Sequence, residues 1–107
     1  MKTALLTGEE IISQHSANLM RGLEGVGGRI YITNQRLIFE SHSLNIQTGA
    51  EVIVLSSIID TKKIWSRFLG IPLAPNGLKV TTQYGEYAFV VYGRTKIIDT
   101  INKYKSA

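Results

Sequence analysis

Residues 28–41 contain the pattern that most constrains how this chain can fold. Apolar side chains occupy every second position on both sides of Asn34-Gln35, and they are Ile30, Ile32, Leu37 and Phe39. A period of two is typical of strands that bury one face. Asn34-Gln35 leaves a two-residue connection between the segments, and Asn tolerates the positive φ that tight hairpin turns require. The stretch therefore predicts a β-hairpin.

Other parts of the chain favour strands as well. The β-rich segments are residues 51–55, 58–65, 78–82 and 86–92. Pro75-Asn76-Gly77 is a strong turn signal before the third of them. Residues 9–21 fit either a bent first strand or a helical turn, and residues 22–28 are interpreted as a glycine-rich link into the hairpin. The count predicts about seven strands.

The C-terminal segment changes its period. Its apolar residues stand at i, i+1, i+4 and i+7, and they are Ile97, Ile98, Ile101 and Tyr104. This spacing lines one face of an α-helix, and Thr95 is expected to be its N-cap. We therefore expect a mainly β fold of about seven antiparallel strands followed by one amphipathic helix. A strongly bent sheet needs such an element to cover its open end.

Length and composition place the chain among small globular proteins. Its 107 residues fit one domain over residues 1–107, and 44% hydrophobic residues are enough for an ordinary core. No apolar run approaches the roughly 20 residues of a membrane span, and the first residues lack the pattern of a secretory signal. Because cysteine is absent, disulfides and thiolate metal sites are excluded. We expect a cytoplasmic protein, with peripheral attachment to a membrane as the alternative.

Several segments follow the order found in one known family. They are Thr7-Gly8-Glu9, residues 28–39, residues 53–59, residues 75–82, residues 87–91 and Arg94. On these residues, which span nearly the whole chain, the sequence resembles the GRAM domain of the pleckstrin-homology-like superfold. The resemblance implies a partly open barrel of seven strands closed by a C-terminal helix. It also implies a binding module without catalytic activity that associates with membranes, phosphoinositides or protein partners.

No catalytic or metal-binding motif competes with this interpretation. His15 and His42 are isolated and belong to no short metal-ligand spacing, so surface or turn positions are expected for both. The sequence has no nucleophile elbow and no phosphate-binding glycine loop. Glu9 and Glu10 are adjacent, and adjacent strand residues point to opposite faces, which disfavours an acid–base pair. We expect no enzyme activity, no cofactor and no small-molecule substrate.

Residues 62–73 combine basic, aromatic and aliphatic side chains and form the strongest candidate binding site. The candidate residues are Lys62, Lys63, Trp65, Arg67, Phe68 and Lys79. One hypothesis is a loop that presses apolar side chains into a membrane interface, where Trp is favoured and each Lys adds about 1 kcal/mol on an anionic surface. A second is that Trp65 and Phe68 fold back onto the core or cover an end of the barrel. A third is that residues 68–73 form a self-association patch.

Two further groups of basic residues are weaker candidates. The first consists of Arg21, Arg29 and Arg36, near the hairpin. For this set we expect structural pairing with Glu40 across or along the sheet rather than a binding role. Arg94 and Lys96 precede the C-terminal helix, where either phosphate binding at the helix N-terminus or simple solvation is physically reasonable.

A net charge of +4 and a pI near 9.5 favour anionic partners, and simple solubility is the alternative explanation. We expect a non-catalytic binding module that acts through protein interaction or self-association. Peripheral binding to anionic lipid or phosphoinositide headgroups through residues 62–73 is the alternative. A nucleic-acid-binding barrel is not expected, because Tyr31 stands alone on its strand while Tyr87 and Tyr104 fit the core pattern.

Overall fold

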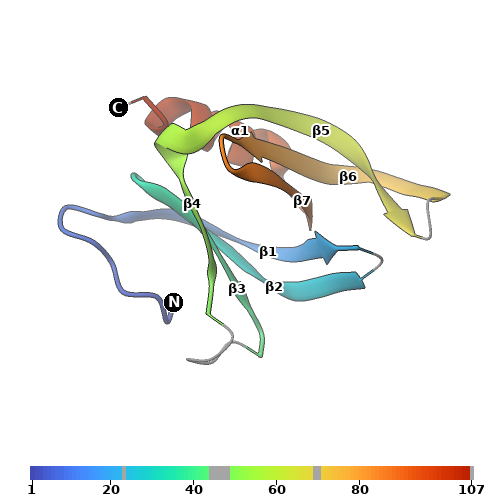
Figure 1. The fold of residues 1–107 in the computed structure, drawn as a ribbon, viewed down its shortest axis with the longest axis horizontal. Helices are drawn as coiled ribbons and strands as arrows, with labels where there is room; N and C mark the ends of the chain where they lie inside the picture. The colour runs from blue at the N-terminus through green and yellow to red at the C-terminus, as the bar shows by residue number, and fades with distance from the viewer. Residues whose placement is uncertain (23, 44–48, 69–70, 107) are drawn as a thin grey trace.

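The computed structural model describes residues 1–22, 24–43, 49–68 and 71–106. Within these residues seven antiparallel strands form one sheet, and an α-helix follows them (Figure 1). The elements are β1 (Ile11–Arg21), β2 (Glu24–Thr33), β3 (Arg36–Ser41), β4 (Glu51–Val54), β5 (Ile58–Phe68), β6 (Ile71–Thr82), β7 (Gly85–Val91) and α1 (Arg94–Tyr104). The predicted fold class is confirmed.

The sheet places β4 and β5 at its two edges, although they follow each other in the chain. Its strand order is β4-β3-β2-β1-β7-β6-β5, and a 3₁₀ turn at Leu55–Ser57 joins the two edge strands. A sheet of this order has to bend around, and β4 and β5 meet at a corner on the left of Figure 1. Within the described residues the two edges do not pair, so the barrel is partly open.

The central hairpin forms as its alternation predicts. The apolar side chains that face each other across β2 and β3 are buried, and they are Ile30, Ile32, Leu37 and Phe39. Thr33 holds the turn, because its hydroxyl accepts hydrogen bonds from the backbone N–H of Gln35 (3.0 Å) and Arg36 (2.7 Å). Thr hydroxyls commonly stabilise turns by such local bonds.

Helix α1 covers the inner face of the bent sheet. Its apolar residues pack into or against the core, and they are Ile97, Ile98, Ile101 and Tyr104. The predicted helical face is therefore confirmed. The N-cap is Gly93, with a left-handed backbone at φ 72°, and the helix begins at Arg94, so the prediction that Thr95 caps it is wrong. Glycine adopts this conformation without the steric cost that a Cβ brings.

The first two strands occupy the region that the sequence leaves ambiguous. β1 pairs with β2 and β7, so the strand interpretation of residues 9–21 is correct and the helical turn is wrong. Most of the expected glycine-rich link belongs to β2. A Cβ at Gly28 would collide with the carbonyl oxygen of Glu40 on the neighbouring strand. Gly28 therefore permits close approach of two strands, a recognised use of glycine inside sheets.

The N-terminal strap (residues 1–10) crosses the outer face of β3. Ile38 points to that face, because its two neighbours on the strand point into the core. Its side chain is nevertheless fully buried. The strap accounts for this burial, since it is bound to Arg36 on one side of Ile38 and to Glu40 on the other.

Candidate functional site

Residues 62–73 are expected as a loop, but 62–68 lie on β5 and 71–73 on β6, two paired strands (the hairpin of β5 and β6) that reach toward the right-hand end of Figure 1. Residues 69–70 lie outside the described part of the structure. The turn predicted at Pro75-Asn76-Gly77 is wrong, because these residues lie inside β6. Register shifts between β5 and β6 accommodate them, with the extra residues on β6. β6 pairs with β7 only from Gly77 onward, so at Pro75 a second strand lies on one side only. Proline has no backbone N–H, and it is tolerated at an edge because no neighbouring strand on the open side needs that hydrogen bond.

Gly77 and Arg94 fix the base of this hairpin. A Cβ at Gly77 would lie 2.8 Å from the carbonyl oxygen of Ile64, so the close approach of β5 and β6 requires glycine. The Arg94 guanidinium donates hydrogen bonds to the carbonyl oxygens of Ile64 (2.9 Å) and Gly77 (3.0 Å). Arg94 therefore ties α1 to the hairpin, a structural role that differs from both sequence-based interpretations.

Three of the candidate cations lie together on the two strands. Lys62 and Lys63 are exposed on β5, and Lys62 lies directly opposite Lys79 on β6. The Lys79 side chain is partly exposed, and its Nζ lies 3.9 Å from the Glu86 carboxylate, a long ion pair near the surface. Like charges directly opposite each other destabilise an antiparallel pair. The hairpin therefore carries a concentration of positive charge that sheet stability does not favour.

The same hairpin exposes large apolar side chains near its connected end. They are Trp65 (53% exposed), Ile71 (63%) and Leu73 (61%). The hypothesis that Trp65 folds back onto the core is therefore wrong. The candidates whose side chains lie outside the described part of the structure are Arg67 and Phe68. For these two residues the proposed contact with a membrane or partner stays a prediction.

The second basic set does not form one surface. Its members are Arg21, Arg29 and Arg36. Arg21 pairs with Glu51 at 2.8 Å, whereas Arg36 is buried and pairs with Glu9. Arg29 lies directly opposite Glu40 across β2 and β3. Arg36 pairs with Glu9 instead of Glu40, because the strap brings Glu9 onto the outer face of β3. No local spacing in the sequence signals this contact between residues 27 positions apart.

The ion pair of Glu9 and Arg36 is bidentate and almost fully buried. Arg36 Nη2 lies 2.6 Å from Glu9 Oε1, and Arg36 Nε lies 2.8 Å from Glu9 Oε2. The Thr33 hydroxyl and the Leu6 backbone N–H also donate to this carboxylate. The hydrogen bonds from Arg36 outweigh burial and lower the pKa of Glu9 from 4.5 to about 2. Because both oxygens have partners, the pair is built to hold the strap.

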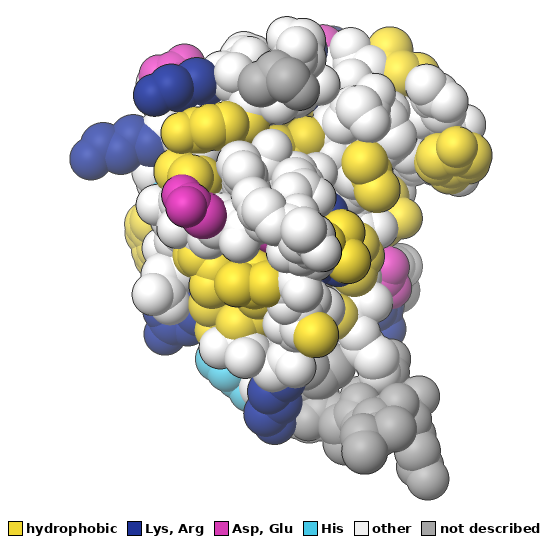
Figure 2. Space-filling model, turned by 90° about the vertical axis from the view of Figure 1, so that its left-hand side faces the viewer, with side chains coloured by type: hydrophobic (Ala, Val, Ile, Leu, Met, Phe, Trp, Pro, Cys, Tyr) yellow, Lys and Arg dark blue, Asp and Glu magenta, His cyan; other side chains and the backbone are white. Residues whose placement is uncertain are grey.

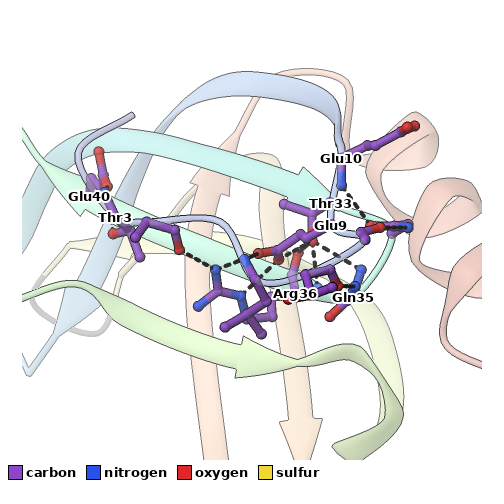
Figure 3. A network of polar contacts seen from close by, with 12 residues as sticks. Thr3, Glu9, Glu10, Thr33, Gln35, Arg36 and Glu40 are labelled. Carbon is purple, nitrogen blue, oxygen red and sulfur yellow. Dashed lines mark hydrogen bonds and ion pairs between the residues drawn. The ribbon is translucent and has the colours of Figure 1, made fainter.

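Glu40 holds the start of the strap. Its carboxylate accepts hydrogen bonds from the backbone N–H of Lys2 (3.0 Å) and Thr3 (2.7 Å) and from the Thr3 hydroxyl (2.6 Å). Burial acts to raise the pKa of Glu40, but these hydrogen bonds outweigh it and lower the pKa. Figure 3 shows Glu40 with Thr3 at one end of the strap contact and Glu9 with Arg36 at the other.

The remaining titratable and apolar features give no sign of a catalytic centre or a membrane-spanning helix. The His15 ring is hydrogen-bonded to the Ser13 hydroxyl (3.1 Å), and burial, reinforced by Lys96, lowers the pKa of His15. Among residues that the structure describes, no group of three or more His, Asp or Glu side chains could hold a metal ion. No helix within these residues combines the length and apolar character that crossing a bilayer requires.

The bent seven-stranded sheet with its C-terminal helix defines a pleckstrin-homology-like domain. The C-terminal domain of an unknown protein from Leishmania infantum is similar over 94% of this chain and 88% of its own, with a TM-score of 0.73 and 17% identity. The Vps36 N-terminal PH domain is similar over 95% of this chain and 81% of its own, with a TM-score of 0.64 and 16% identity. Both likenesses concern the fold.

The family assignment comes from the sequence. Residues 1–105 match the family model of the GRAM domain, and the chain therefore belongs to the GRAM domain family. GRAM domains are typically non-catalytic binding modules. A search of proteins with curated descriptions gave no match.

Proposed function

We propose that this GRAM domain binds anionic membrane surfaces peripherally and that the hairpin of β5 and β6 is the part that docks. The observation that carries the proposal is the cross-strand pair of Lys62 and Lys79 on a hairpin that also exposes Trp65, three residues farther along β5. A like-charged pair lowers the stability of a sheet. An anionic surface would convert this repulsion into attraction, because both cations would then face negative charge.

The charge of the hairpin supports an anionic partner. Residues 58–82 contain four basic residues and one acidic residue, Asp60, for a net charge of +3 out of +4 for the whole chain. Each Lys or Arg near an anionic bilayer contributes about 1 kcal/mol. Electrostatic attraction of this size is reversible and sensitive to salt, as expected of a peripheral protein.

The apolar residues support a lipid surface. The side chains of Trp65, Ile71 and Leu73 are more than half exposed. Contact of their apolar surface with water is unfavourable in free energy. Trp is enriched at the membrane–water interface, where its ring meets both apolar chains and polar headgroups. Apolar side chains near the end of the hairpin and lysines farther along it would match the order of acyl chains and headgroups in a bilayer.

Vesicle binding tests the proposal, and Trp65 provides the probe because it is the chain's single tryptophan. Vesicles of phosphatidylcholine with phosphatidylserine, and others with a phosphoinositide added, should shift its emission to shorter wavelength and carry the protein in flotation. Raising the salt concentration should release it. Vesicles of phosphatidylcholine alone should bind far less.

The matched variants separate local charge from net charge. Lys62→Glu with Lys63→Glu should abolish flotation on anionic vesicles. Lys96→Glu with Lys103→Glu changes the net charge equally on exposed positions of α1 and should retain most binding. Absence of flotation on every anionic vesicle would overturn the proposal, and equal loss in both variants would reduce it to a general charge effect.

A further inference from the structure

The sheet ends at β4, and the backbone of this strand has an open edge. Leu55 donates its N–H to the carbonyl oxygen of Gln35 (3.0 Å), which continues the ladder between β3 and β4. Along an antiparallel strand, successive residues direct their backbone N–H and C=O groups alternately toward one neighbouring strand and away from it. Leu55 bonds to β3, so the N–H and C=O groups of Val52 and Val54 point away from β3. Within the described residues no strand lies beyond β4. The Val54 carbonyl oxygen accepts one hydrogen bond, from the Ser57 hydroxyl (2.7 Å), and a carbonyl oxygen has a second lone pair. This edge can therefore accept another strand.

The side chains next to the open edge are apolar and exposed. Val52 and Val54 are 40% and 51% exposed, and Leu5 and Leu6 of the strap are 47% and 53% exposed. Val54 lies opposite Arg36, and Arg36 binds the carbonyl oxygen of Ala4 (2.9 Å), so strap and strand are held together. Figure 2 shows hydrophobic side chains gathered on the left-hand side of Figure 1, where β4 and the strap lie.

β4 lacks the devices that protect edge strands. Natural edges carry lysines, prolines or bulges that discourage pairing with another chain. β5, the opposite edge, has register shifts and the exposed Lys62 and Lys63. β4 pairs with β3 in an unbroken register, and its one charge, Glu51, is compensated by Arg21 at 2.8 Å. The shortness of β4 limits the strength of pairing but does not prevent it.

We propose that β4 is a self-association surface, on which β4 of a second copy of this chain pairs antiparallel. A two-fold axis at Ile53 sets Val52 opposite Val54 of the second copy, so their outward amide groups bond to each other. Glu51 then lies opposite Leu55 of the second copy, and no like charges meet. A two-fold axis at Lys62 on β5 would bring Lys62 against Lys62 of the second copy, which is unfavourable.

The chemistry of the surface selects a second copy over other partners. The edge carries no uncompensated charge that would attract an acidic or basic segment. Every copy presents the same uncharged valine strand and the same leucines, and isologous contact requires only that a surface complement itself. The strap is fixed by the buried Glu9 and Arg36 pair, so little order has to be gained on association.

Sedimentation equilibrium across micromolar to millimolar concentration tests the proposal. The wild-type chain should show a reversible monomer–dimer equilibrium, unchanged or strengthened by salt. Val54→Lys should raise the dissociation constant at least tenfold, because the two-fold axis brings a lysine of each copy close to the pairing edge. Ile59→Lys, at a residue of β5 that is 62% exposed, should leave it unchanged. Both substitutions are at exposed positions and should leave the unfolding midpoint close to that of the wild type.

Hydrogen exchange gives an independent test of the strand that pairs. The Val52 and Val54 amides should exchange more slowly as protein concentration rises, while the β5 amides should not change. A monomer at every concentration would overturn the proposal. So would a dimer that Ile59→Lys weakens and Val54→Lys does not. Vesicle binding is not needed for either result, so failure of the membrane proposal would not affect this one.

Discussion

The outer face of β3 and the hairpin of β5 and β6 use charged side chains in opposite ways. Arg36 on β3 is buried, bidentate with Glu9 and neutralised. Lys62 on β5 is exposed and faces Lys79, another cation. The first arrangement gives each charge a close partner of opposite sign. In the second, Lys79 makes a long ion pair with Glu86 (3.9 Å), and the two cations still face each other. The two regions belong to one sheet of seven strands.

This difference separates charges that build the fold from charges available to a ligand. A buried pair stabilises only while both partners are present, so neither member is free to meet another molecule. An exposed like-charged pair costs stability and has no structural benefit. The basic residues of this chain therefore differ in their surroundings, and we propose that those of the hairpin are the ones used in recognition.

The largest effect is expected from breaking the buried pair. Arg36→Met should lower the free energy of unfolding by about 3–5 kcal/mol, because it leaves Glu9 buried and charged without its cation. Urea unfolding measures the change. Lys62→Met, which removes an equal charge from the hairpin, should not lower the free energy of unfolding and should raise it by no more than about 1 kcal/mol. Equal losses in the two variants would contradict the distinction between the regions.

Lowering the pH should reveal the same difference between the two regions, because it protonates Glu9. The pKa of this carboxyl is lowered from 4.5 to about 2, so its stabilising contribution is complete above pH 4.5 and declines as pH falls toward 2. The shift corresponds to about 3 kcal/mol, and Glu40, whose pKa is also lowered, acts in the same direction. Unfolding measured across this range should show the loss, and Glu9→Gln should flatten much of it. A profile unaffected by Glu9→Gln would contradict the assignment.

A smaller effect is expected at the base of the hairpin. Gly77→Ala should destabilise the protein by about 1–3 kcal/mol, because the added Cβ would lie 2.8 Å from a backbone oxygen that cannot yield easily. Gly25→Ala on β2 is the control, since a Cβ there meets its nearest atoms at 3.7 Å. Thermal unfolding distinguishes them. A tolerated alanine at Gly77 would mean that the hairpin is not fixed as described.

Local patterns in the sequence predict much of this fold. The hairpin around Asn34-Gln35 and the helical face from Ile97 to Tyr104 both follow from hydrophobic periodicity, because one face of each element is buried in the core. The turn signal at Pro75-Asn76-Gly77 fails for a physical reason. Proline is tolerated where β6 has β5 alone beside it, and Gly77 is required by packing against Ile64.

The candidate site is predicted less completely. The cluster of Lys62, Lys63 and Trp65 could be found from composition alone, but the direct opposition of Lys62 and Lys79 requires the strand register. The pairing of Arg36 with Glu9 depends on where the strap folds, which no local spacing determines. The exposure of Val52 and Val54 could not be read from a β-rich segment, since buried and edge strands share that composition.

We propose that the hairpin cations serve binding at a cost in stability, and Lys62→Thr is the most direct test. Removing one member of the like-charged pair should raise the free energy of unfolding by about 0.2–1 kcal/mol. The same variant should bind phosphatidylserine-containing vesicles roughly fivefold more weakly, as expected for the loss of about 1 kcal/mol. A variant that is more stable and binds less is the predicted result. Unchanged vesicle binding would contradict the claim.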